Sequence, residues 1–284
     1  MPLDLRSRVA KIVFDRVAGA EGPARRERIH HTEGVRWFAD DRPIRAVHGD
    51  SSMFIGGLRA LLLQSLHPLA MAGVAGHSGY RGDPWGRLQR TSYFIAVTTF
   101  GLAVDAEAAV AKVQAVHKRV RGIATDGRPY SAGDPHLLRW VHLAEVDSFL
   151  ATYQRYGAAP LTAGSRDGYV ADTARVARAL GIADPPESEA ELGEQLDSYR
   201  CELQGTPEAR TAARFLLLRP PLPVIARLPY ALLASASVAS LPAWARGPLQ
   251  LPHLPRAEAT VVRAAGFGII KTLRWVTAPV PESV

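Results

Sequence analysis

The sequence predicts an all-α protein with a single domain over residues 1–284. Apolar residues recur at helical spacing through most of the chain, whereas the alternation typical of strands is scarce. Hydrophobic residues make up 47% and charged residues 21% of the chain, a composition typical of a globular protein with a buried core. No internal repeat, low-complexity tract or linker divides the sequence, which favours one domain.

Glycine and proline separate the expected elements. A short amphipathic helix over 4–18 precedes a polar, arginine-rich segment at 20–34 and a connection or short helix at 35–48. The later segments expected to be helical are 51–76, 87–101 (helix or strand), 105–122, 135–156, 166–180, 187–203 and the proline-rich region from Pro220. Glycine-rich loops are expected at 76–86 and 125–135.

Local signals predict where several helices bend, begin and end. Pro68 should bend the apolar helix, because proline cannot donate the helical hydrogen bond. Asp105 is expected to cap the N-terminus of the next helix, and Gly122 to end it. Asp134 followed by Pro135 predicts a capped helix start with proline at the first helical position.

The charge balance favours an anionic partner. Lys and Arg exceed Asp and Glu by seven, and most of the basic residues are arginines, which bind carboxylates and phosphates in a bidentate manner. A nucleic-acid partner is not expected, because no basic block interleaved with aromatic residues and no binding motif occurs. The single cysteine, Cys201, excludes an intramolecular disulfide and is interpreted as structural.

Two apolar segments are candidate membrane contacts. Arg59 and Pro68 interrupt the segment 53–76, and Arg227 and three prolines interrupt 222–245, so neither has the run of about 18 apolar residues that a spanning helix needs. The first is expected to be a buried central helix, and the second to be able to lie on a membrane surface. The N-terminal sequence lacks the apolar core of a secretion signal, so we expect a cytoplasmic protein, with membrane association as an alternative.

His117 occupies an apolar face of the predicted helix 105–122. Val110, Val113 and Val120 lie seven and four residues before it and three after it, and so share its face. A buried imidazole must satisfy two ring nitrogens. Two interpretations follow from this pattern: a core histidine bonded to a carbonyl and a hydroxyl, or a metal ligand of the kind that holds haem iron.

Two further histidines lie in apolar helices. His67 directly precedes Pro68, where it can satisfy a freed carbonyl or act as a ligand or distal catalytic group. His142 has Glu145 three residues later, a pairing that can hold one tautomer in place, although a core or ion-pair role is equally consistent with the sequence.

Arg87, Arg90 and Thr91 form the remaining candidate group. In a helix Arg87 and Thr91 share a face, and together they can bind an anion such as a carboxylate or propionate. Solvent exposure is the alternative for the arginines.

Five segments in order resemble the oxygenase family that includes latex-clearing rubber oxygenase and the fungal mycophenolate-pathway oxygenase. They are "GGLRALLLQSLHPLAMAGVAGHS", "RLQRTSYFIAVTTFG", "VHKRVRG", "YSAGDPHLLRWVH" and "DSFLATYQRYG". The resemblance covers about 50–160 and extends more loosely into the C-terminal region, which places an oxygenase-like core at about 35–250.

The resemblance implies an all-α fold that encloses a pocket for non-covalent haem b, with O₂ and a small apolar substrate as further partners. It implies His117 as the iron ligand and Arg87 and Thr91 as cofactor-binding residues, and we expect His142 to bind the cofactor as well. Two departures stand out. Arg90 replaces a lysine that the rubber oxygenases carry before the threonine, and the apolar helix lacks their distal glutamate.

His67 is the polar group that this helix offers instead. It becomes the expected distal group and second iron ligand, and His67, Arg90 and Thr91 become the expected catalytic residues. The leading hypothesis is therefore a haem-dependent oxygenase that acts on an isoprenoid- or lipid-like substrate. The alternatives are a non-catalytic lipid- or membrane-surface-binding protein, and a haem protein without oxygenase activity. The sequence does not predict the oligomeric state.

Overall fold

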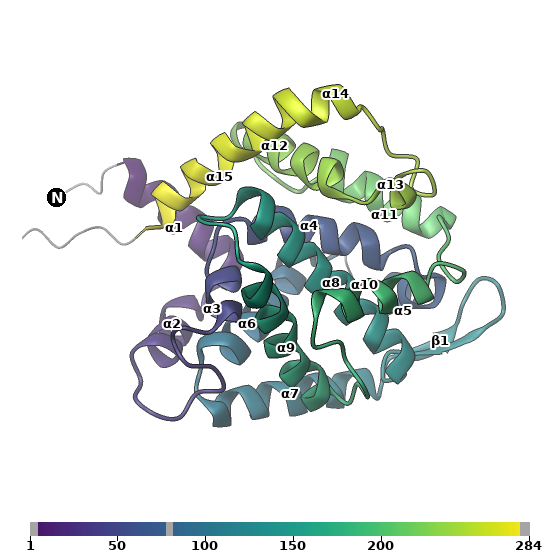
Figure 1. The fold of residues 1–284 in the computed structure, drawn as a ribbon, viewed down its shortest axis with the longest axis horizontal. Coiled ribbons are helices and arrows are strands. Elements are labelled where there is room, and N and C mark those ends of the chain that lie inside the picture. The colour runs from purple at the N-terminus through teal and green to yellow at the C-terminus, as the bar shows by residue number, and fades with distance from the viewer. Residues whose placement is uncertain (1–4, 78–81, 279–284) are drawn as a thin grey trace, which may run out of the picture.

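Helices make up nearly all of the regular structure in the computed structural model, which describes residues 5–77 and 82–278 (Figure 1). The first half of the chain forms α1 (Leu5–Ala18), α2 (Gly22–His30), α3 (Pro43–His48), α4 (Met53–Gln64), α5 (Pro68–His77), α6 (Pro84–Phe100) and α7 (Ala103–His117). The second half forms α8 (Pro135–Tyr156), α9 (Ala163–Leu180), α10 (Glu189–Ser198), α11 (Pro207–Leu218), α12 (Val224–Ser240), α13 (Ala243–Arg246), α14 (Pro255–Ala257), the π-helical η1 (Glu258–Val262) and α15 (Arg263–Thr277). Between the halves lies an antiparallel hairpin of β1 (Arg121–Ile123) and β2 (Pro129–Ser131). The predicted all-α fold is confirmed.

Helices α4 and α8 form the centre of the main core. Leu62 and Leu63 on α4 and Trp140 and Leu143 on α8 are each 0% exposed and belong to one apolar cluster. At Gly56 the two helices approach so closely that a β-carbon would lie 2.7 Å from Thr152 Oγ1 and 2.8 Å from Phe149 Cδ1. The apolar segment predicted to be a buried central helix is therefore buried through α4.

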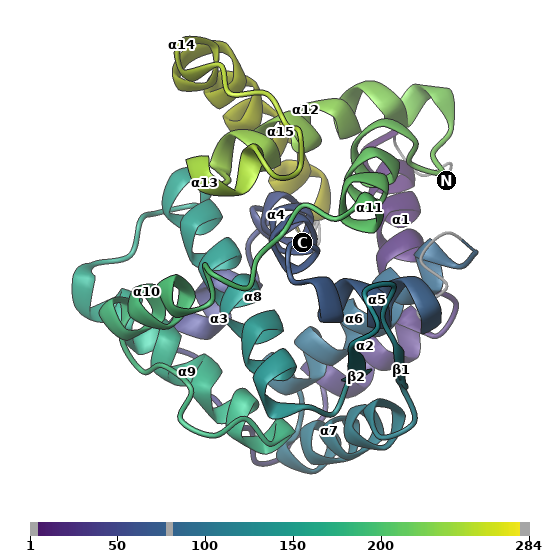
Figure 2. The ribbon, with the colours of Figure 1, turned by 90° about the vertical axis from the view of Figure 1, so that its right-hand side faces the viewer.

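A C-terminal layer covers the opposite side of α4. Helices α12 and α15 pack against each other and lie over α4 and the end of α8 (Figures 1 and 2). A second cluster joins the layers through Ile55, Tyr156, Ala236 and Ile270, each 0–1% exposed. The first helix reaches this layer as well, because Arg6 Nε donates to Trp275 O over 3.0 Å.

The predicted bend at Pro68 is a complete break between two helices. Helix α4 ends at Gln64, α5 begins at Pro68, and their axes differ by 108°. His67 lies at this corner and is 1% exposed. Among the described residues no single helix is long and apolar enough to cross a membrane. Of the adjacent helix pairs there, only α4 and α5 together have the length and apolar composition of a membrane span, and they are bent.

The helix that carries His117 differs from its prediction at both ends. It begins at Ala103 after Leu102, so Asp105 does not cap it but lies in the first turn, where Arg28 Nε donates to its Oδ2 over 2.9 Å. It ends at His117, and Gly122 lies in β1. The helix therefore ends before Val120, the last residue of the expected apolar face. The hairpin of β1 and β2 occupies part of the loop expected at 125–135.

The other helices follow local signals closely. The segment 87–101 is a helix, and 135–156 matches α8, whose Asp134 cap accepts from His136 N over 2.9 Å.

Helix α11 was not predicted. In the loop expected at 76–86, α5 extends to His77 and α6 begins at Pro84, while residues 78–81 lie outside the described part of the chain.

Candidate functional site

Helix α6 positions Arg87, Arg90 and Thr91. Asp83 caps its N-terminus by accepting from Gly86 N over 2.8 Å, and Pro84 holds the first helical position. The helical spacing puts half-buried Arg87 and exposed Thr91 on one face, as predicted. The side chain of Arg90 is 65% exposed and pairs with Asp83 Oδ2 over 3.2 Å.

His117 is the last residue of α7, a helix that packs against α6. The side chain is half-buried, and its ring makes no hydrogen bond to any residue that the structure describes. Burial lowers the pKa of His117, which favours the neutral imidazole. A neutral imidazole whose ring nitrogen has no hydrogen-bond partner can bind a metal ion.

His142 and Glu145 lie in the middle of α8. In the described part of the chain no hydrogen bond joins the two side chains, so the predicted pairing is absent, and His142 Nε2 is buried without a partner. Burial lowers the pKa of His142 to about 4 and raises that of Glu145 to about 7. A stranded buried nitrogen costs about 1–3 kcal/mol, which makes His142 Nε2 a polar atom suited to a ligand.

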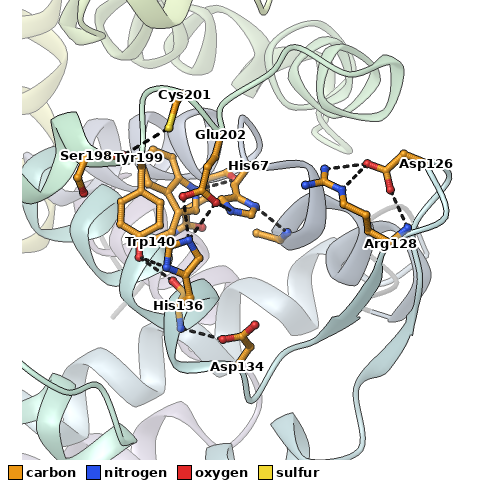
Figure 3. Close-up of polar contacts among 12 residues, drawn as sticks. His67, Asp126, Arg128, Asp134, His136, Trp140, Ser198, Tyr199, Cys201 and Glu202 are labelled. Carbon is orange, nitrogen blue, oxygen red and sulfur yellow. Dashed lines mark hydrogen bonds and ion pairs between the residues drawn. The ribbon is translucent and has the colours of Figure 1, made fainter.

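His67 belongs to a polar group that we call the histidine–glutamate cluster: His67, His136 and Glu202 (Figure 3). His136 Nε2 lies 2.9 Å from both carboxylate oxygens of Glu202, and His67 Nε2 lies 3.3 Å from Oε2. Both ring nitrogens of His67 have partners, since Ala70 N donates to Nδ1 over 3.5 Å.

Electrostatics keep this cluster's carboxylate ionised. Burial alone would raise the pKa of Glu202, but the hydrogen bonds and charges of His136 and His67 hold it below its usual range. The pKa of His67 is lowered because burial outweighs the hydrogen bond to Glu202. Burial also raises the pKa of neighbouring Tyr199 to about 12, so its hydroxyl keeps its proton.

Sequence reasoning did not find His136, Tyr199 or Glu202. His136 followed a helix cap and Glu202 followed Cys201, with no motif spacing at either place. Cys201 is a free, exposed thiol that donates to Ser198 O over 3.8 Å. The apolar segment around His67 has no carboxylate of its own, as expected from the sequence. The fold brings Glu202 to His67 from 135 positions further along the chain.

The chain is thus a helical domain with two candidate ligands among its described histidines, His117 on α7 packed against α6 and His142 on α8. The chain belongs to the family described as the catalytic domain of ER-bound oxygenase mpaB/B′ and rubber oxygenase, whose sequence profile matches residues 45–275. The expected family is thereby confirmed, and the protein carries an oxygenase catalytic domain. No curated protein and no solved structure matches the chain.

Proposed function

We propose that this protein is a haem b-dependent oxygenase that acts on an apolar, isoprenoid- or lipid-like substrate. The observation that carries the proposal is the half-buried ring of His117, which makes no hydrogen bond to the described residues and is carried by a helix packed on α6, in a chain of an oxygenase family. Haem iron is commonly held by a neutral imidazole in an apolar surrounding.

The chain offers apolar side chains that could contact a haem. Ala70, Val74, Phe94, Ile95 and Val141 of α5, α6 and α8 are only partly buried against the main core. The unpartnered Nε2 of His142 is a second polar atom available to a bound group. Non-covalent attachment agrees with the single cysteine, Cys201, which cannot provide a pair of thioether links.

In this proposal each residue has a defined task. His117 supplies a ring nitrogen to the iron, Arg87 pairs with a propionate, and the Thr91 hydroxyl gives a second donor on the same face. Haem, when bound, supplies the O₂ chemistry, while the protein sets ligation, polarity and access. To act on substrate, Arg90 would leave Asp83, and a distal role for His67 would require Nε2 to leave Glu202.

The test is an absorption spectrum of protein expressed with a haem precursor, recorded as isolated and after dithionite. A Soret band is expected in the parent protein, and its loss or displacement in His117→Ala. The exposed His31→Ala is the matched control and should keep the parent spectrum. A colourless parent protein, or a band unchanged in His117→Ala, contradicts the proposal.

A second candidate function is binding to an anionic membrane surface, with or without catalysis. It is favoured by Val224, Ile225 and Leu228 at the start of α12, which are 76%, 88% and 71% exposed, beside exposed Arg227. Cosedimentation with anionic vesicles that weakens with salt would support it.

O₂ uptake with candidate substrates separates an oxygenase from a haem protein without oxygenase activity.

A further inference from the structure

The histidine–glutamate cluster has the spacing of ligands around a metal ion. One ligating atom from each of His67, His136 and Glu202 lies within 4.8 Å of the others. Two atoms that each bind one ion at about 2.0–2.2 Å lie roughly 3–3.5 Å apart. The measured separations of 2.9 Å from His136 to Glu202 and 3.3 Å from His67 to Glu202 already approach that range.

Tyr199 determines how the ring of His136 is oriented and protonated. Its hydroxyl donates to the backbone oxygen of His136 over 2.9 Å, so its single proton is used there. The same oxygen lies 3.2 Å from His136 Nδ1 and can therefore only accept from Nδ1–H. A neutral His136 then turns the lone pair of Nε2 toward the carboxylate of Glu202.

Two lone-pair-bearing groups facing each other at 2.9 Å repel unless a positive species lies between them. That species is either a second proton on His136 or a cation shared by Nε2 and the carboxylate. Metal-ligating histidines are generally oriented by a hydrogen bond at the ring nitrogen that does not bind the ion. The contact between His136 Nδ1 and the hydroxyl of Tyr199 is of this kind.

His67 is the weakest of the three groups as a ligand. Because Ala70 N donates to Nδ1, a neutral His67 carries its proton on Nε2 and donates it to Glu202. Binding an ion at Nε2 moves that proton to Nδ1 and gives up the contact with Ala70. This contact is 3.5 Å long, at the limit of a hydrogen bond, so little is lost.

Separate elements hold the three side chains in place. His67 lies at the α4–α5 corner, His136 in the first turn of α8, and Glu202 just after α10 (Figure 3). Gln204 N donates to Leu66 O over 2.8 Å, which ties the segment of Glu202 to the corner. The ring of Tyr199 stacks on His136 with centroids 4.6 Å apart.

Charge and access also suit a cation. Arg128 acts electrostatically on Glu202, but its guanidinium is already paired with Asp126 over 2.7 Å. When both imidazoles are neutral, the carboxylate of Glu202 is the charged group of the cluster. The side chains of His136 and Glu202 are 49% and 37% exposed while His67 is buried, which leaves one side open to water or another ligand.

We propose that His67, His136 and Glu202 bind a divalent transition-metal ion. Two imidazoles and one carboxylate form the ligand set of open zinc and non-haem iron(II) sites, with positions left for water or substrate. The three ligands do not include His117, Arg87 or Thr91, and the metal site gives His67 a task other than that of a distal haem group.

The test uses Co²⁺ as a spectroscopic probe of the full-length protein, purified with chelator and dialysed. We expect one Co²⁺ per chain, with visible absorption bands of a low-symmetry nitrogen–oxygen site, displaced by Zn²⁺. Glu202→Gln and His136→Gln keep the volume but lose a ligand, and each should weaken binding by about tenfold or more. Tyr199→Phe keeps all three ligands and should weaken binding by about 10–100-fold, because it removes the group that orients His136.

Exposed Glu194→Gln is the matched control and should bind Co²⁺ like the parent. The proposal is overturned if the parent takes up no stoichiometric Co²⁺, or if Glu202→Gln binds as tightly as the parent. His117→Ala separates the two proposals. It should lose the Soret band but retain the Co²⁺ site, whereas failure of the haem proposal leaves the Co²⁺ titration unchanged.

Discussion

Arg59 on α4 and Asp147 on α8 form an ion pair across the centre of the fold, with Nη1 2.6 Å from Oδ2. The arginine side chain is only 4% exposed. It also donates from Nη1 to Ser148 Oγ over 2.7 Å and from Nε to Ser240 O over 2.8 Å. The charge that interrupts an otherwise apolar helix in the sequence therefore connects α4 to both α8 and the end of α12.

Replacing Arg59 with leucine should lower the free energy of unfolding by about 3 kcal/mol, the lower end of the usual cost of breaking a buried pair. Asp147 is 29% exposed, so water compensates part of the loss. Urea unfolding followed by circular dichroism measures the change. Lys11→Ala removes the exposed pair with Asp15 and should change stability by less than about 1 kcal/mol. Equal effects of the two variants would contradict a central role for Arg59.

Two adjacent glycines on α4 should respond oppositely to alanine. At Gly56 a β-carbon would meet Thr152 Oγ1 at 2.7 Å and Phe149 at 2.8 Å, so Gly56→Ala should destabilise the protein by about 1–3 kcal/mol. At Gly57 nothing lies within 4 Å, so Gly57→Ala should stabilise it by about 0.5–1 kcal/mol. Thermal unfolding of both variants measures this. A stabilising Gly56→Ala would mean that α4 and α8 are further apart.

Local sequence signals predicted the elements that local chemistry determines. Pro68 broke the apolar helix, and Asp134 with Pro135 started α8 where expected. The start of α7 was misplaced because an acidic residue in a first turn resembles a cap, while Asp105 in fact pairs with Arg28 from α2. That ion pair depends on where α2 packs, and the residues next to Asp105 in sequence do not indicate this position.

Among the candidate site residues, too, some follow from local sequence patterns and others depend on tertiary structure. Arg87 and Thr91 share a face because helical periodicity places them there. The histidine–glutamate cluster depends on the 108° corner at His67 and on the backbone bond that ties Gln204 to Leu66. Both are tertiary features, so neither His136 nor Glu202 could be recognised from its neighbours in sequence.

The two arginines of α6 should differ in their effect on haem. Arg87 is half-buried and shares a face with Thr91, and the side chain of Arg90 is 65% exposed. Under the proposed function, Arg87→Ala removes a charge-assisted bond to a propionate and should weaken haem binding by roughly 10–100-fold. Arg90→Ala should leave haem binding within about threefold of the parent. Titration of haem-free protein with haemin measures both. Equal losses would contradict the assignment of Arg87.

His48 on α3 should make stability depend on pH. Its ring is enclosed between Thr99 Oγ1, 2.8 Å from Nδ1, and Tyr169 Oη, 3.3 Å from Nε2. Burial lowers the pKa of His48 from 6.5 to about 3, so the folded protein keeps it neutral while the unfolded chain takes up a proton. The contribution is therefore complete above pH 6.5 and falls as the pH drops toward 3, by at most about 1.4 kcal/mol per pH unit. Urea unfolding of the parent and of His48→Gln at pH 8 and pH 5 isolates this contribution. The stability of the variant should fall by roughly 1–2 kcal/mol less than that of the parent between the two values, and identical pH dependence in both proteins would show that His48 is not held neutral by the fold.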